Sequence, residues 1–321
     1  PTFFSNEPPT IRSGSVRSER DNRTQLASLV VDYDLSIGTI TSSTSLNKYR
    51  DELLLGVGVI LPPEAAFTID LDARSESFNQ ELTLTSTIDD VDFILGATYT
   101  NADRETDFAQ DLSLITPPIS LFSVATITRT DTEQFAFFGE VSKPFMDGLL
   151  TPLVGLRYYR DERKFRDADS NNANVSEFED VFSTFSPRFN LAIKPSEEVR
   201  VYLNVAKGFR SGNFNPQGFV GLAQLFGVET NTANPEASLW AYEVGARFNL
   251  LGGDLVIEPA VYYNDYSDYQ FAGTVGGVAL VSLSLDKVES VGADLVINSA
   301  TGIDGLSLGF SGNINETTAK N

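Results

Sequence analysis

The chain has 321 residues, 41% of them hydrophobic and 21% charged, so it can fold around apolar side chains and is not a disordered acidic tail. Its 44 acidic and 23 basic residues give a net charge of −21, which excludes nucleic acid as the default partner, because cationic side chains drive binding to a phosphate backbone. It has no histidine and no cysteine, which excludes Ser-His-Asp triads, Cys-His pairs, zinc sites and disulfides.

The N-terminal region carries no signal for export or for membrane insertion as a helix. The chain begins with Pro1 rather than Met, and its first apolar stretch, residues 26–31, is too short for a signal peptide. We therefore expect an internal fragment of a longer protein. No window approaches the roughly 20 consecutive apolar residues of a spanning helix, whereas a membrane-spanning strand needs only about 9–11 alternating residues.

Apolar and polar residues alternate with a period of two along most of the chain, which predicts strands. From Val199, for example, Val199, Val201 and Leu203 share one face while Arg200 and Tyr202 share the other. The pattern predicts about twelve strands, near residues 24–36, 38–49, 75–87, 92–103, 131–144, 149–162, 183–194, 199–206, 240–249, 254–267, 283–298 and 305–316.

The links between these strands are of two kinds. Short links rich in Gly, Asp and Pro join the strands in pairs, which indicates hairpins, at residues 36–38, 89–90, 146–148, 195–197, 251–254 and 301–305. The links between pairs are about 12–28 residues long, well above the median of about 4–6 in compact domains. Alternating short and long links are typical of an outer-membrane barrel.

The side chains fit that interpretation. Aromatic residues cluster at the long-link ends, where rings favour the headgroup level of a membrane: Tyr158, Tyr159, Phe182, Phe185, Phe189, Phe209, Phe214, Tyr262, Tyr263, Tyr266 and Tyr269. Charged residues on the polar faces are expected to point into the barrel lumen: Arg157, Arg188, Arg200, Glu243, Arg247 and Glu258. The alternative is a soluble β-sandwich or β-helix, whose links should be short at both ends.

Several strings resemble segments of TonB-dependent outer-membrane receptors. Residues 206–215, AKGFRSGNFN, resemble the family's SKGFRSGGFN segment, with Asn213 in place of the second Gly. Residues 130–141, 240–245, 262–270 and 288–297 resemble other strands of the same proteins, in the same order.

This resemblance implies a 22-stranded transmembrane antiparallel β-barrel, with short periplasmic turns and long extracellular loops, in the outer membrane of a Gram-negative bacterium. Residues 1–321 would hold about twelve of the strands, and the signal peptide, the plug domain and the C-terminal strands would lie elsewhere. Such a piece alone is not expected to transport.

The resemblance also implies a function. The expected activity is uptake of a scarce nutrient, above all a ferric siderophore, driven by the TonB complex acting through the plug, with no enzymatic step and no resident cofactor or metal. The alternative is a passive porin or an adhesin-like barrel. The expected ligand-binding residues, on extracellular loops, are Phe209, Arg210, Asn213, Phe214, Asn215, Tyr266 and Tyr269.

Two alternatives stay open from the residues themselves. The same aromatic residues could serve only as an interfacial girdle and loop anchor. The acidic stretch from Asp167 lacks the Gly and the final Glu of an EF-hand, which leaves two alternatives: a looser calcium site with Glu177, Glu179 and Asp180, or a solvated acidic loop.

Overall fold

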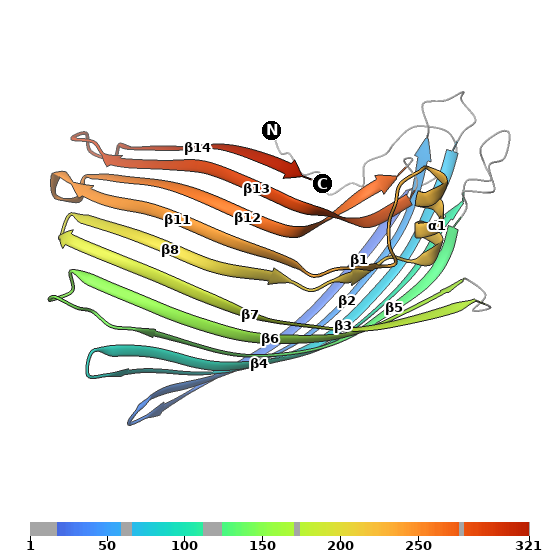
Figure 1. Ribbon diagram of the computed structural model, residues 1–321, viewed down its shortest axis with the longest axis horizontal. Coiled ribbons are helices and arrows are strands. Elements are labelled where there is room, and N and C mark those ends of the chain that lie inside the picture. The colour runs from blue at the N-terminus through green and yellow to red at the C-terminus, as the bar shows by residue number, and fades with distance from the viewer. Residues whose placement is uncertain (1–17, 59–65, 112–123, 170–173, 276–278, 321) are drawn as a thin grey trace.

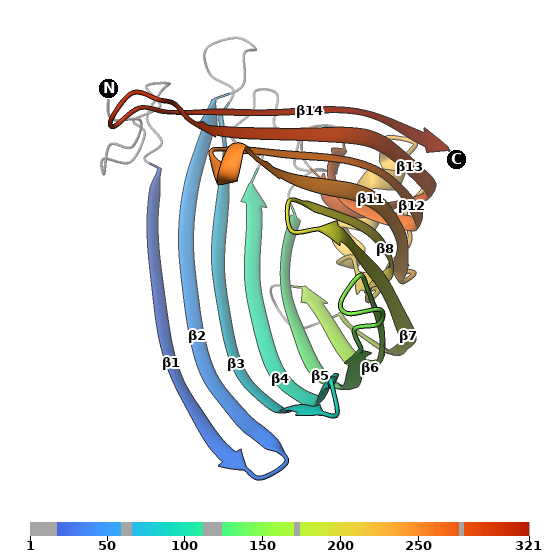
Figure 2. The same cartoon turned by 90° about the vertical axis from the view of Figure 1, so that its left-hand side faces the viewer.

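The computed structural model describes residues 18–58, 66–111, 124–169, 174–275 and 279–320. They form a strongly curved antiparallel sheet of twelve strands (Figures 1 and 2). The strands are β1 (Glu19–Leu35), β2 (Gly38–Gly58), β3 (Ala66–Ile88), β4 (Val91–Asp111), β5 (Val124–Ser142), β6 (Leu150–Asp169), β7 (Val175–Ser196), β8 (Val199–Arg210), β11 (Ala237–Leu250), β12 (Leu255–Val275), β13 (Ala279–Ala300) and β14 (Ser307–Lys320). Every strand pairs with its neighbour in this order, which confirms the all-β prediction and leaves β1 and β14 as the two edges of the described sheet.

The six short links form tight turns at one end of the sheet, at the left of Figure 1. Asp89 and Asp90 have φ of 49° and 60°, the left-handed conformation of a two-residue hairpin turn, which Asp tolerates better than most residues. Met146 and Asp147 also have positive φ. The hairpin prediction is therefore confirmed.

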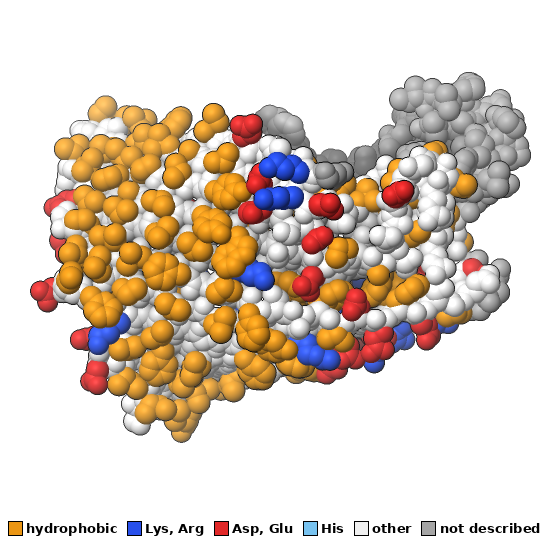
Figure 3. Space-filling view, viewed as in Figure 1, with side chains coloured by type: hydrophobic (Ala, Val, Ile, Leu, Met, Phe, Trp, Pro, Cys, Tyr) orange, Lys and Arg blue, Asp and Glu red, His pale blue; other side chains and the backbone are white. Residues whose placement is uncertain are grey.

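Strand pairing separates two faces of the sheet. On β6 the side chains of Val154, Leu156 and Tyr158 lie on one face, together with Phe137 of β5 and Phe185 of β7, which are the cross-strand neighbours of Tyr158. Hydrophobic side chains of this kind cover the part of the outer surface next to the short turns, and charged side chains begin where they end (Figure 3). This surface is the outer face, and the opposite, concave side is called here the lumen face.

Polar side chains pair along the lumen face. Arg188 donates to Glu140 at 3.2 Å, Arg247 to Glu258 at 2.7 Å, and the Tyr202 hydroxyl to Glu243 at 2.7 Å. Arg157 and Arg200 lie on the same face by register. The predicted lumen positions of these charges are therefore confirmed.

Aromatic rings cover glycines of the neighbouring strand on the lumen face. Phe138 lies over Gly96, Tyr202 over Gly245 and Tyr262 over Gly292, and each ring is the direct cross-strand partner of its glycine. A Cβ on any of these glycines would come within 2.2–2.5 Å of the ring. The absence of a side chain lets each ring lie flat on the wall, a known device for stabilising glycine in a sheet.

The strands are longer at the long-link end than the sequence predicts. Strand β2 runs to Gly58 rather than to residue 49, and β3 begins at Ala66 rather than at residue 75. The polar residues there, interpreted as loops, continue the ladder, and their outward side chains form ion pairs across or along strands, such as Arg50 with Asp72 at 3.3 Å. Longer strands leave three of the five links between pairs shorter than the predicted 12–28 residues, whereas the links at residues 112–123 and 211–236 keep lengths within that range.

The aromatic prediction is correct only in part. Phe185 and Tyr263 face outward with Tyr158, but Tyr159 and Tyr262 face the lumen, because neighbours on a strand point to opposite faces. Adjacent tyrosines therefore cannot both belong to an outer girdle.

The segment 211–236, called here the crossing segment, folds back over the lumen face and contains the only α-helix of the described residues. It carries β9 (Asn213–Phe214), α1 (Gln217–Leu225) and β10 (Ala233–Asn234), where β9 pairs with β10. Phe219, Leu222 and Ala223 of α1 pack against Val275 and Val281 at the β12–β13 tip, and the cluster extends to partly buried Phe108, Val124, Val228 and Leu283. Helix α1 thus bridges two distant parts of the sheet (Figure 1). A nine-residue helix is too short to cross a bilayer, and the described residues hold no helix that could.

Candidate functional site: a basic cavity on the lumen face

A cavity of about 490 Å³ lies where β7 and β8 separate. Residues 188–196 of β7 pair with residues 199–206 of β8, and the pairing stops there. The last four residues of β8, Lys207–Arg210, are therefore paired on one side only, with β11. The residues lining the opening are Arg157, Tyr159, Arg163, Ser186, Lys207, Gly208, Phe209, Arg210 and Ser211, and we call it the basic cavity.

Four cations and two aromatic rings line this cavity, with no carboxylate among the lining residues. Of these cations, Arg157, Lys207 and Arg210 make no ion pair with any residue that the structure describes. Arg163 is paired with the fully buried Asp161 at 2.8 Å. Three uncompensated positive charges in a concave site create a local positive potential despite the net charge of −21.

Aromatic rings hold the Arg157 side chain in position. The Arg157 guanidinium lies 5.8 Å from the Tyr159 ring centroid and 5.7 Å from that of Phe138. Tyr159 packs against Phe209 with ring centroids 5.7 Å apart. These contacts hold the guanidinium by cation–π attraction. One of its N–H groups donates to the Thr98 hydroxyl at 3.5 Å, and the others are left for an anionic ligand.

Hydrogen bonds to the backbone fix the remaining wall of the cavity. Arg163 donates to the carbonyl oxygen of Gly212 at 2.9 Å, and Arg210 donates to the carbonyl oxygen of Gln270 at 3.3 Å. The Gln270 amide donates in turn to the carbonyls of Ser211 and Pro235, at 3.1 and 2.6 Å. The cavity is thus held from β6, β8 and β12 together.

The residues expected to bind ligand fall into three groups. Phe209 and Arg210 line the basic cavity. Phe214 stacks on Phe165 at 5.3 Å and Phe178 at 6.1 Å, while Asn213 and Asn215 hydrogen-bond to β13 and to the crossing segment. These three side chains anchor the segment. Tyr266 and Tyr269 contact each other edge to face at 5.3 Å and do not line the basic cavity.

Sequence reasoning did not propose seven of the cavity residues as ligand contacts: Arg157, Tyr159, Arg163, Ser186, Lys207, Gly208 and Ser211. Part of the signal was present, because Arg157, Tyr159 and Arg163 share one face of a single strand by their spacing. No sequence pattern indicated Lys207, because Lys207 lines the cavity only where the pairing of β7 with β8 ends, and that end is set by the tertiary fold.

The calcium alternative falls partly on residues that the structure does not describe, Ser170 to Asn172. Elsewhere in the described chain no group of three or more Asp or Glu side chains is arranged to hold a metal ion. Glu177 and Glu179 lie on β7 opposite Arg166 and Lys164 of β6.

A family model for the TonB dependent receptor-like β-barrel matches residues 2–321. Among solved structures, the chain is similar to the ferric yersiniabactin uptake receptor FyuA from Yersinia pestis, with a TM-score of 0.73 and 16% identity over 94% of this chain and 43% of that one. It is also similar to the siderophore receptor PiuA from Acinetobacter baumannii (TM-score 0.69, 12% identity, 94% and 47% covered) and to the ferric-catecholate import receptor Fiu from E. coli K12 (0.62, 14%, 94% and 48%). At these identities the similarity shows the fold, and the chain spans less than half the length of the structures it matches.

Proposed function

This chain belongs to the TonB-dependent receptor-like β-barrel family, whose members are receptors and transporters of the Gram-negative outer membrane rather than enzymes, and we propose that it serves active uptake of a ferric siderophore. The ligand is an anionic metal chelate that enters from outside the cell. The protein contributes binding and passage, and the metal is part of the cargo.

The basic cavity is the observation that carries this proposal. A chelate with carboxylate, catecholate or phenolate groups keeps negative charge around its metal, and Arg157, Lys207 and Arg210 supply unpaired cations at the cavity wall. Tyr159 and Phe209 supply ring faces for the flat parts of such a molecule.

Energy coupling by the TonB complex is the second part of the proposal. An outer membrane has no nucleotide supply, so concentrating a scarce ligand across it requires work delivered from the inner membrane. The TonB complex would act on a plug domain seated against the lumen face, where the ladder of polar pairs Arg188–Glu140, Tyr202–Glu243 and Arg247–Glu258 offers a hydrophilic wall.

We further propose that strands and a plug outside residues 1–321 complete the barrel. Within the described sheet, β1 and β14 each pair on one side only, and an open edge is not tolerated in lipid. The coverage of less than half of each matched receptor supports the same arrangement.

The test uses the complete protein, produced in a Gram-negative host deleted for its own siderophore receptors, with and without a functional TonB complex. Uptake of radioactive iron supplied as a panel of anionic chelates should be saturable and should require TonB.

Uptake that rises linearly with concentration and is unchanged without TonB would instead support the passive porin. If no chelate is taken up although the protein reaches the outer membrane, the siderophore assignment is wrong.

A further inference from the structure

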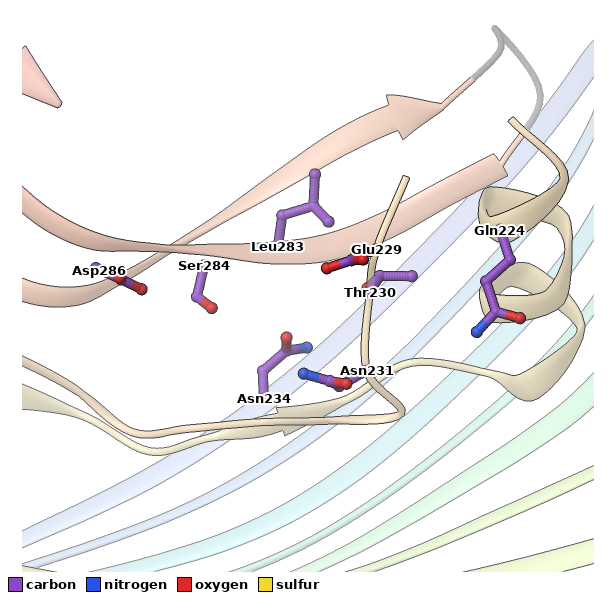
Figure 4. Close-up of a pocket in the computed structure, with 8 residues that line it drawn as sticks. All are labelled: Gln224, Glu229, Thr230, Asn231, Asn234, Leu283, Ser284 and Asp286. Carbon is purple, nitrogen blue, oxygen red and sulfur yellow. The ribbon is translucent and has the colours of Figure 1, made fainter. Parts of the chain in front are cut away.

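A second cavity, of about 660 Å³, lies between the crossing segment and β13 and has the opposite character to the basic cavity (Figure 4). It is lined by Gln224, Glu229, Thr230, Asn231, Asn234, Leu283, Ser284 and Asp286, and we call it the acidic cavity. Its lining holds two carboxylates, three side-chain amides and two hydroxyls, with no cation and no aromatic ring.

One buried amide ties the two walls of this cavity together. Asn215, 2% exposed, accepts a hydrogen bond from the Ser282 N–H at 2.7 Å and donates to the Ser282 carbonyl at 2.8 Å, which fixes it to β13. The same amide donates to the carbonyl of Asn231 at 2.9 Å, and the Asn215 N–H donates to the carbonyl of Thr232 at 2.7 Å. These hydrogen bonds therefore fix the distance between residues 229–234 and β13.

The polar lining is directed into the space between these walls. Figure 4 shows Glu229 and Asn234 on the segment and Ser284 on β13 directed into the gap between the two, with Asp286 at one end of it. Asn234 is buried, and its amide nitrogen donates to Asn213 at 2.8 Å, which holds this side chain in place.

The two carboxylates of the cavity are uncompensated. Glu229 and Asp286 are both exposed, and neither forms an ion pair with a residue in the described part of the chain. Lys287, which pairs with Asp265 and Glu289, points to the opposite face of β13 from Asp286. Two negative charges in a concave site without a cation concentrate a negative potential there.

We propose that the acidic cavity binds a small organic molecule, or part of one, that carries an ammonium group. An ammonium has three N–H donors and no acceptor, which suits a lining of carboxylate, amide and hydroxyl oxygens. A bare metal ion is disfavoured, because no three acidic side chains gather among the described residues, and the lack of an aromatic ring disfavours a stacked ligand.

The test is equilibrium dialysis of the complete protein, purified from outer membranes in detergent, against radiolabelled 1,5-diaminopentane at low ionic strength. We expect saturable binding that 1,5-pentanediol, of the same length but uncharged, does not displace. The double variant Glu229→Gln, Asp286→Asn should bind at least about tenfold more weakly, because two charge interactions are lost.

A matched control variant, Glu236→Gln with Glu316→Gln, removes the same net charge from exposed positions that do not line the cavity. It should bind as the unchanged protein does. Equal weakening in both variants would show that only net charge matters, and displacement by Ca²⁺ at equal concentration would show a metal site. Either result, or the absence of saturable binding, would overturn the proposal. The experiment includes no chelate and no TonB, so its outcome is independent of the transport proposal.

Discussion

Asn215 and Ser282, 67 positions apart in the chain, exchange two hydrogen bonds in the way that two opposed residues do in an antiparallel sheet. Strand β14 pairs with β13 only between Lys287 and Ala300, so Ser282 lies beyond the reach of β14. The side-chain amide of Asn215 supplies one donor and one acceptor, and thereby takes the place of a missing strand residue. This one side chain joins the crossing segment to the barrel wall.

Replacing Asn215 with Ala should release the segment 211–236 from β13. The N–H and carbonyl of Ser282 would lose their partner, which costs about 1–3 kcal/mol for a buried group. Limited proteolysis and hydrogen exchange of the complete protein should show faster cleavage and exchange within residues 211–236, with the other strands unchanged. Asn231→Ala, an exposed amide on the same segment, is the control and should behave as the unchanged protein. Equal protection in both variants would contradict the role of Asn215.

Replacing Arg157 or Lys207 with Gln should weaken binding of an anionic ferric chelate by about tenfold each, because a charged hydrogen bond contributes about 1.5–3 kcal/mol. Arg160→Gln is the matched control, since Arg160 lies on the same strand as Arg157 but on the outer face, paired with Glu162 at 3.2 Å. Fluorescence titration of the purified complete protein measures the affinities. Similar losses at Arg157 and Arg160 would show that the basic cavity is not the binding site.

A charge on the outer face should impair membrane insertion, while the same charge on the lumen face should not. Val154 is 53% exposed on the outer face of β6, and Val154→Arg should cost about 2–4 kcal/mol near the middle of the bilayer. Asn190→Arg places the same side chain on the lumen face of the adjacent β7, where it should be tolerated. Folding of the complete protein into lipid vesicles under a urea gradient compares the two. If both variants insert equally well, the assignment of the faces is wrong.

Adding a methyl group at Gly245 should displace the Tyr202 ring. A Cβ there would lie 2.5 Å from the ring, so Tyr202 must move and its 2.7 Å hydrogen bond to Glu243 is lost, at a cost of about 1–3 kcal/mol. Gly302→Ala, in a turn with open space around it, should have little effect on the free energy of unfolding. In a double-mutant cycle, Gly245→Ala should cost much less in a Tyr202→Ala background. Simple additivity would mean that the ring and the glycine do not interact.

Much of the wall of the barrel could be predicted from the sequence because it depends on local patterns. Alternation placed Arg157, Arg188 and Glu243 on the lumen face, and turn residues such as Asp89 and Asp90 marked the hairpins. Periodicity of two is a property of neighbouring residues, so it needs no knowledge of the rest of the chain. The predicted ends of the strands were less accurate, since polar residues beyond the apolar band, such as Arg50 and Asp72, pair across strands although they look like loop residues.

The strands, their hairpin pairing and the faces of most side chains follow from local patterns in the sequence. Three other features depend on the tertiary fold: residues 211–236 cross the lumen face, QGFVGLAQL forms a helix, and Lys207 and Arg210 meet Arg157 around one cavity. The helix buries Phe219 and Leu222 against the β12–β13 tip, more than fifty positions away, and the cavity exists because the β7–β8 ladder ends at Arg188 and Ala206. Both features arise from contacts between residues far apart in the chain, which a local pattern does not encode.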